Sequence, residues 1–104
     1  MKLVLIIAGI TACCLGAPAL ADGLENLKKA GCLTCHAVDR KVVGPPFKDV
    51  AAKYKNDTGA EARLIKKVKG GGGGVWGKIR MPANLGKMTD EEYKTTVEWI
   101  LSLK

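Results

Sequence analysis

The sequence predicts an all-α domain of about four short helices, and three observations point to it. Apolar residues recur at spacings of three and four, which places them on one face of a helix. Two Thr-x-x-Glu capping boxes mark helix starts, at Thr58–Glu61 and Thr89–Glu92. No stretch alternates apolar and polar residues for long enough to predict a strand. A chain of 104 residues holds one small domain.

Each helix has an apolar face and a recognisable end. Gly31 ends the first helix, the second covers about two turns, Gly70 ends the third, and the last reaches about Leu103. The third and fourth helices start at the two capping boxes. The apolar faces are, in order, Leu24, Leu27 and Ala30; Phe47, Val50, Ala51 and Tyr54; Leu64, Ile65 and Val68; and Tyr93, Val97, Ile100 and Leu101.

Two long segments between the helices, 37–46 and 70–88, are rich in glycine and proline. Irregular segments of this length in a small domain indicate function or disorder. We interpret the five glycines of Gly70–Gly74 as a helix C-cap that continues into a loop, with Val75–Gly77 packing after it. Because the chain has only five aromatic residues, we expect a cofactor to fill part of the interior.

The first 21 residues have the pattern of a secretory signal peptide. Lys2 supplies the positive charge, an aliphatic run follows, and Ala19–Ala21 offers the small residues that a signal peptidase reads. We therefore expect cleavage after Ala21, export to the periplasm, and a mature domain of residues 22–104. An uncleaved membrane anchor and lipidation of Cys13 are the two alternatives.

Cleavage changes the composition of the chain. The full sequence has 17 basic and 10 acidic residues, a net charge of +7, and four cysteines. The mature domain of 83 residues loses Lys2, Cys13 and Cys14, so its net charge is +6 and two cysteines remain. A domain of this size is marginally stable without a staple or a cofactor.

The two remaining cysteines belong to a C-x-x-C-H segment, Cys32–His36, which is the spacing of covalent c-type haem attachment. On a helical turn, Cys32 and Cys35 present both sulfurs on one side for thioether formation, and His36 follows as an axial iron ligand. Other uses are weaker. A thioredoxin-type pair needs a βαβ surround, a zinc site lacks a fourth ligand, and a Cys32–Cys35 disulfide leaves the enclosed space unfilled.

A second axial ligand cannot be a histidine, because His36 is the only one. Met81 and Met88 are the candidates, since a thioether sulfur is a soft ligand. Met81 precedes Pro82 and so lies in an extended loop that can cross to the opposite haem face. Met88 directly precedes the second capping box, where we expect it to pack on Tyr93 as a hydrophobic staple.

Six segments occur in an order that resembles the small bacterial class I cytochromes c of the c-551/c-552 group, also called cytochrome c8. The resemblance covers essentially the whole mature chain. It implies a class I cytochrome c fold, with about four short helices around one covalently attached haem c, and it favours Met81 as the iron ligand. The segments are Gly31–His36, Lys41–Pro45, Lys48–Tyr54, Gly74–Gly77, Met81–Asn84 and Trp99–Leu101.

The resemblance implies roles for four more residues. Pro45 would accept a hydrogen bond from the imidazole ligand and orient it. Asn84 would hydrogen-bond near the Met81 sulfur. Trp76 and Lys67 would hold a haem propionate, although a solvated helix face explains Lys67 equally well.

The chain departs from the family pattern beside the expected methionine ligand. Arg80 stands where the family usually has a proline, and Ala83 replaces a second common proline. Residues 85–88 also form a slightly longer segment than usual. These changes leave the loop more flexible and bring a positive charge near the exposed haem edge, so they affect loop rigidity and reduction potential more than ligation.

With both axial positions filled, iron offers no site for O2 or substrate, so we expect an electron-transfer protein and not an enzyme. The resemblance implies a soluble, monomeric, periplasmic carrier between respiratory complexes. Electrons would come from membrane cytochrome complexes and pass, for example, to nitrite reductase or a terminal oxidase. A basic face would dock on an acidic surface of the redox partner. No nucleic acid and no small-molecule substrate is expected.

Two other functions stay open at this point. If Met81 does not bind iron, His36 alone would leave a five-coordinate haem suited to gas binding or peroxidase-like chemistry. A binder of nucleic acid or membrane surfaces would act through charge without haem. The basic residues, however, are scattered and few aromatic residues accompany them.

Overall fold

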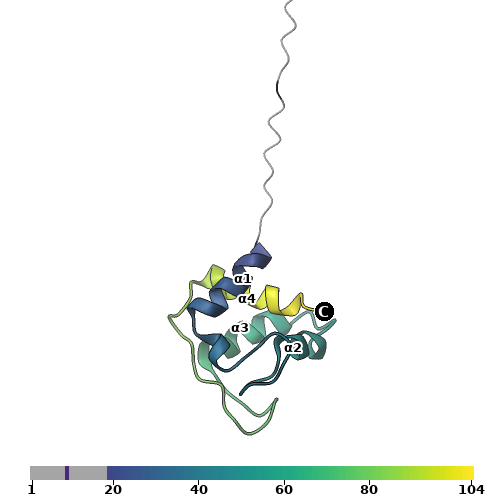
Figure 1. The fold of residues 1–104 in the computed structure, drawn as a ribbon, viewed down its shortest axis with the longest axis vertical. Helices are drawn as coiled ribbons and strands as arrows, with labels where there is room; N and C mark the ends of the chain where they lie inside the picture. Colours follow the sequence, from purple (N-terminus) through teal and green to yellow (C-terminus); the bar gives the residue numbers. More distant parts are fainter. Residues whose placement is uncertain (1–8, 10–18) are drawn as a thin grey trace, which may run out of the picture.

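The computed structural model of the protein describes residue 9 and residues 19–104. This part of the chain forms, in order, α1 (Ala19–Lys29), the 3-10 turn η1 (Cys32–Thr34), α2 (Phe47–Lys53), α3 (Ala60–Gly70) and α4 (Asp90–Leu101) (Figure 1). Its only extended pairings are two isolated bridges, so the all-α prediction is confirmed. The predicted leader, with Cys13, lies outside the described residues except for Gly9 and the start of α1. Among the described helices, none combines the length and apolar character that a membrane crossing requires.

Helix α1 packs mainly on α4, which also contacts α2 and α3 (Figure 1). Gly23 permits the close approach of α1 and α4, because a Cβ atom there would overlap the Trp99 side chain. The buried Asn26 donates from Nδ2 to the Glu92 carbonyl, 3.4 Å away, and so ties α1 to the first turn of α4. After α1 the chain turns at Gly31, as predicted, with a φ of 78° that suits glycine.

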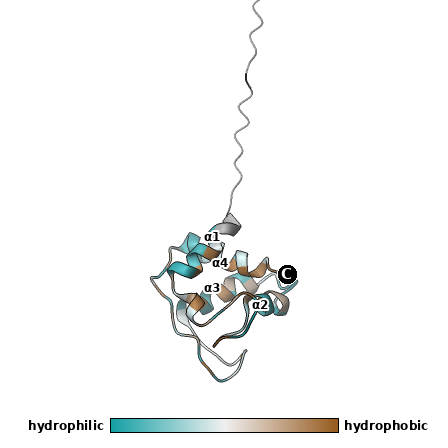
Figure 2. Cartoon of the chain, viewed as in Figure 1, coloured by the Kyte–Doolittle hydropathy of each residue, from teal (hydrophilic) through white to brown (hydrophobic). Residues whose placement is uncertain are grey.

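The core lies where α1, α2 and α4 meet. Hydrophobic residues gather in the C-terminal part of α4, whereas α3 mixes hydrophobic and charged residues (Figure 2). The predicted face of α2 is confirmed, since Phe47, Val50 and Ala51 are buried and Tyr54 packs against the core just after the helix. The central buried cluster consists of Leu27, Phe47, Val50 and Ile100.

The two predicted capping boxes have different outcomes. In the second, Thr89 Oγ1 accepts from the Glu92 amide at 3.1 Å and Glu92 Oε1 accepts from the Thr89 amide at 2.9 Å, as predicted. The box at Thr58–Glu61 is wrong, because α3 begins after Gly59 without a side-chain cap. Asp57 competes with the threonine, since its Oδ1 accepts from the Gly59 amide at 3.1 Å in a local turn.

Candidate cofactor site

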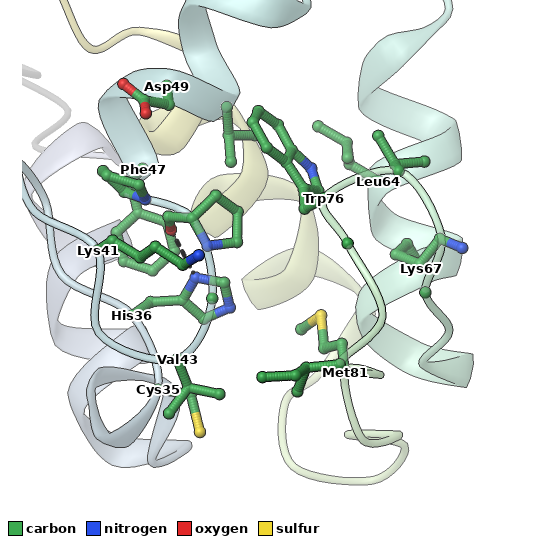
Figure 3. A pocket seen from close by; sticks show the side chains of 18 of the residues that line it. Cys35, His36, Lys41, Val43, Phe47, Asp49, Leu64, Lys67, Trp76 and Met81 are labelled. Atoms are coloured by element: carbon green, nitrogen blue, oxygen red, sulfur yellow. Dashed lines mark hydrogen bonds between the residues drawn. The ribbon is translucent and has the colours of Figure 1, made fainter.

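A cavity of about 620 Å³ opens between the two long loops (Figure 3). Its inner wall is apolar and comes from α2, α3 and α4. A cavity of this volume with an apolar wall and a few polar groups is typical of a cofactor site. The inner wall consists of Phe47, Val50, Leu64, Val68, Val97 and Ile100, and the loops and α3 add Cys35, His36, Lys41, Lys67, Trp76 and Met81 among others.

The C-x-x-C-H segment forms a 3-10 turn after Gly31. The amides of Cys35 and His36 donate to the Cys32 carbonyl at 3.2 and 3.0 Å. Because a 3-10 turn has about three residues, the side chains of Cys32 and Cys35 lie on the same side of it. Both thiols are free and half-buried, so the alternative disulfide is absent. Burial raises the pKa of the Cys32 thiol above its ordinary value.

His36 projects into the cavity with its ring held by three neighbours. Nδ1 lies 2.9 Å from the Pro45 carbonyl (Figure 3). Since a carbonyl only accepts, Nδ1 carries the proton and Nε2 keeps a free lone pair. The Phe47 ring stacks on the imidazole with centroids 5.0 Å apart and planes 16° from parallel. Gly44 leaves room for the ring, because a Cβ atom there would lie 2.5 Å from His36 Cε1.

Met81 lies on the opposite wall of the cavity, with its sulfur facing His36 (Figure 3). Its backbone forms an antiparallel bridge with Gly72, through hydrogen bonds of 2.7 and 3.0 Å. Gly71 precedes this bridge with a φ of 71°, and a Cβ atom there would lie 2.6 Å from the Met81 carbonyl oxygen. The glycine run therefore brings bare backbone up to the methionine, in addition to ending α3.

Met88, the other candidate sulfur, does not line this cavity. Its Sδ accepts a hydrogen bond from the Thr96 hydroxyl at 3.7 Å. Met88 and Tyr93 line the same adjoining space of about 30 Å³, which is where packing on Tyr93 was predicted. The structure thus brings Met81 to the large cavity and places Met88 among the helices.

Trp76 and Lys67 both line the cavity, but they have different neighbours: Trp76 contacts Lys53, and Lys67 lies beside Gly72. Trp76 is 42% exposed and Val75 is 53% exposed, and the segment of residues 75–77 borders the cavity. The Lys67 ammonium lies beside Gly72, where a Cβ atom would be 2.7 Å from it. Lys53 is the cation over the Trp76 ring, with its Nζ 5.6 Å from the centroid.

Asn84 is buried behind the loop and outside the cavity lining. Its Nδ2 donates to the Pro82 carbonyl at 3.1 Å, and its amide lies 3.0 and 3.2 Å from the carbonyls of Val68 and Lys69. Its own carbonyl accepts from the Tyr93 hydroxyl at 2.6 Å. These bonds make Asn84 the point at which the loop is attached to α3 and α4.

The donor groups fit a haem. An imidazole nitrogen and a thioether sulfur on opposite walls of an apolar cavity are ligands that haem iron takes in proteins. Cys35 lines the cavity and Cys32 lines the small adjoining space beside His36. In contrast, within residues 9 and 19–104 no three His, Cys, Asp or Glu side chains converge on a metal-ion site, so Cys32, Cys35 and His36 do not form the alternative zinc site.

Comparison with known proteins agrees with this fit. The cytochrome c family model matches residues 20–104. The chain belongs to the cytochrome c family. Cytochrome c-551 of Pseudomonas aeruginosa is 51% identical over 77 residues, which are 74% of this chain and 72% of that protein. Cytochrome c-551 of Azotobacter vinelandii is 48% identical over 82 residues, which are 79% and 98% of the two chains. The crystal structure of Nitrosomonas europaea cytochrome c552 has a TM-score of 0.73 at 47% identity and covers 78% of this chain and 99% of that one.

This cytochrome c is a small electron carrier with covalently bound haem c, and it is not an enzyme. The predicted c-551/c-552 group and class I cytochrome c fold are confirmed. The contacts of Gly44 with His36 and of Gly72 with Met81 were not predicted from the sequence. The only sequence signals for them were the Gly-Pro-Pro segment and the glycine run, and neither indicates which distant residue approaches.

Proposed function

We propose that this cytochrome c is a soluble periplasmic one-electron carrier whose haem iron is ligated by His36 and Met81. The observation that carries the proposal is the position of the imidazole and the Met81 sulfur on opposite walls of one apolar cavity (Figure 3). The haem supplies one-electron exchange at iron when it is bound. With protein atoms at both axial positions, the site favours electron transfer over binding of O2 or substrate.

The residues around His36 would fix the ligand before haem is bound. Cys32 and Cys35 would form the two thioethers from one face of their 3-10 turn. Pro45 holds the Nδ1 proton, which leaves Nε2 as the ligating atom. The stacked Phe47 ring limits rotation of the imidazole. The chain therefore presents one tautomer and one ring orientation to the cavity.

Trp76, Lys67 and Asn84 would complete the site. The indole N–H of Trp76 is a donor and the Lys67 ammonium is a cation, so both suit a haem propionate from the positions they occupy at the cavity wall. Asn84 would act from behind the loop, where its bond to the Pro82 carbonyl lies directly after Met81 in the chain.

We further propose that residues 1–21 are a cleaved leader and that residues 22–104 are the periplasmic domain. The pattern of the leader and the c-type motif support each other, because c-type haem is attached outside the bacterial cytoplasm. Helix α1 begins at Ala19, so cleavage after Ala21 would remove three residues from its start and leave the part that contacts α4.

A redox partner with an acidic docking surface, such as nitrite reductase or a terminal oxidase, fits the charge distribution of a monomeric carrier. Residues 37–88, which include both loops around the cavity, carry 12 basic and 4 acidic residues, whereas α4 carries one basic and four acidic residues. The two loops also expose several apolar side chains, namely Val42, Val43, Val75 and Ile79. A positive surface that includes apolar residues favours electrostatically steered encounter with an acidic partner.

The test is expression of the full chain in a bacterium that matures c-type cytochromes. We expect red protein in the periplasm, an intact mass equal to residues 22–104 plus one haem, and a ferric spectrum with a sulfur-to-iron charge-transfer band. Met81→Ala should abolish this band and Met88→Ala should retain it. The opposite pattern, or ready CO binding by the ferrous protein without denaturant, would overturn the proposed ligation.

A further inference from the structure

We infer that Tyr93 is a positioning residue for Met81, because its hydroxyl holds the Asn84 carbonyl and thereby the end of the loop that carries Met81. This inference rests on the proposed ligation of iron by Met81. Tyr93 belongs to α4 and does not line the large cavity, so it would act through the loop and not by touching the cofactor.

The bond between Tyr93 and Asn84 is short and inaccessible to water. Tyr93 is 2% exposed and Asn84 is 6% exposed, and the hydroxyl oxygen lies 2.6 Å from the Asn84 carbonyl oxygen. A buried phenol that finds one backbone acceptor fixes that acceptor in place. Since the Asn84 amide is also bonded to the Val68 carbonyl, the same residue joins the loop to both α3 and α4.

The Tyr93 ring is also in contact with α3 through Lys69. The Lys69 ammonium lies 5.0 Å from the centroid of the Tyr93 ring and 2.9 Å from Asp90 Oδ1. It therefore ties α3 to the start of α4 across the face of the ring. The loop after Asn84 offers no comparable hold, because Leu85 is 76% exposed.

Met81 is thus held from two sides. The bridge to Gly72 fixes its own backbone, and only two residues separate it from the attachment point at Asn84. Without the Tyr93 hydroxyl, the Asn84 carbonyl keeps only the Lys87 amide at 3.3 Å. The conformation in which the loop carries Met81 away from iron would then be more populated. Any competing iron ligand gains apparent affinity in proportion to the fraction of molecules in that conformation.

The test is a titration of the ferric holoprotein with imidazole, followed by loss of the sulfur-to-iron band. Tyr93→Phe removes the hydroxyl and keeps the ring against Lys69. We expect its apparent Kd for imidazole to fall about two- to tenfold, the effect of losing one buried hydrogen bond. Thr96→Val is the matched control, because it removes a buried α4 hydroxyl that is bonded to the Met88 sulfur just before the start of α4 and not to the Asn84 carbonyl.

An unchanged Kd in Tyr93→Phe would overturn the inference, and so would an equal fall in both variants, since this would reflect general loosening of the fold. Absence of the sulfur-to-iron band in the parent protein would instead show that the proposed Met81 ligation is wrong. Denaturant unfolding of both variants measures their global stability separately, so a local release of the loop is distinguished from a weaker fold.

Discussion

Gly72 and Met81 form a backbone pair in which each residue both donates and accepts a hydrogen bond, at 3.0 and 2.7 Å. This pair connects the middle of the glycine run to the expected iron ligand. Gly71, with a φ of 71°, turns the chain after α3 so that Gly72 can reach the loop. The position of the Met81 sulfur therefore depends on two residues that have no side chain.

Gly71→Ala should weaken the hold on Met81. Alanine is strained at this φ, and its Cβ would lie 2.6 Å from the Met81 carbonyl oxygen. Gly74→Ala is the control. Gly74 has a comparable φ of 98° but open space around its Cβ position, so this variant measures backbone strain without a steric contact. We expect a loss of unfolding free energy about 1–3 kcal/mol larger in Gly71→Ala, with a weaker sulfur-to-iron band. Equal losses would mean that backbone strain alone sets the effect.

Gly44→Ala should displace the His36 ring. The new Cβ would lie 2.5 Å from Cε1 and 2.9 Å from Nδ1, so the ring must move away and stretch the bond to Pro45. We expect a loss of about 1–3 kcal/mol in the free energy of unfolding and a lower yield of haem-loaded protein. Gly70→Ala, at the end of α3 with no atom near its Cβ, should be neutral or slightly stabilising. Stability equal to the parent in Gly44→Ala would contradict the contact.

The two threonines of the predicted capping boxes should differ when replaced. Thr89→Ala removes the hydroxyl that accepts from the Glu92 amide, and it should cost about 1 kcal/mol of unfolding free energy. Thr58→Ala should change the stability by less than about 0.5 kcal/mol, because α3 begins without a side-chain cap from Thr58. Denaturant unfolding of both variants checks this. A similar loss of unfolding free energy in Thr58→Ala would mean that Thr58 does cap α3.

Glu61 gives the fold a pH dependence. Its Oε1 is buried without a hydrogen-bond partner in the part of the chain that the structure describes. Burial raises the pKa of Glu61 above its ordinary value of 4.5, and the neighbouring Glu98 carboxylate raises it further. The folded state thus binds this proton more tightly than the unfolded state. The contribution of Glu61 to stability falls as the pH rises from about 4.5 through the raised pKa.

Glu61→Gln should therefore stabilise the protein at neutral pH, and the gain should vanish below the ordinary glutamate range. A like-charged pair near the surface, screened by solvent, predicts a gain of about 0.5 kcal/mol. Glu98→Gln is the contrasting variant. A 2.9 Å ion pair with Lys94 lowers the pKa of Glu98, so this change should reduce stability at neutral pH. Denaturant unfolding across the pH range measures both, and a pH-independent gain in Glu61→Gln would contradict the assignment.

Electron transfer with a charged reagent should depend on salt. Reduction of hexacyanoferrate(III), an anion, should slow by about tenfold or more as the Debye length shrinks from about 30 Å at 0.01 M salt to about 8 Å at 0.15 M. Lys78→Gln at the cavity should lower the low-salt rate more than Lys28→Gln in α1, although both remove one charge. Stopped-flow absorbance gives the rates, and equal effects of the two variants would argue against steering toward the cavity.

Local chemistry made much of the fold predictable. The face of α2 and the box at Thr89 depend on residues within one or two turns, so spacing alone located them. The start of α3 was missed because two neighbouring side chains compete for it. Asp57 prevails over Thr58 where Arg63 pairs with its carboxylate, and this contact forms only once the helix exists.

The candidate site divides in the same way. The C-x-x-C-H spacing located the thiols and the imidazole, because all three groups belong to five consecutive residues, Cys32–His36. The neighbours that hold the ligands come from elsewhere in the chain. The Tyr93 hydroxyl reaches the methionine loop from α4, and Phe47 stacks on the imidazole from the start of α2. Such pairs depend on tertiary packing, which a spacing pattern does not contain.

The packing of α1 on α4 also fixes the order in which the domain can form. Leu27 and Ile100 lie far apart in the sequence but share one buried cluster, so this contact can form only after both α1 and α4 are present in the chain. Because Val97 and Ile100 of α4 form part of the inner wall, the cavity is complete only once α4 has packed against α1 and α2.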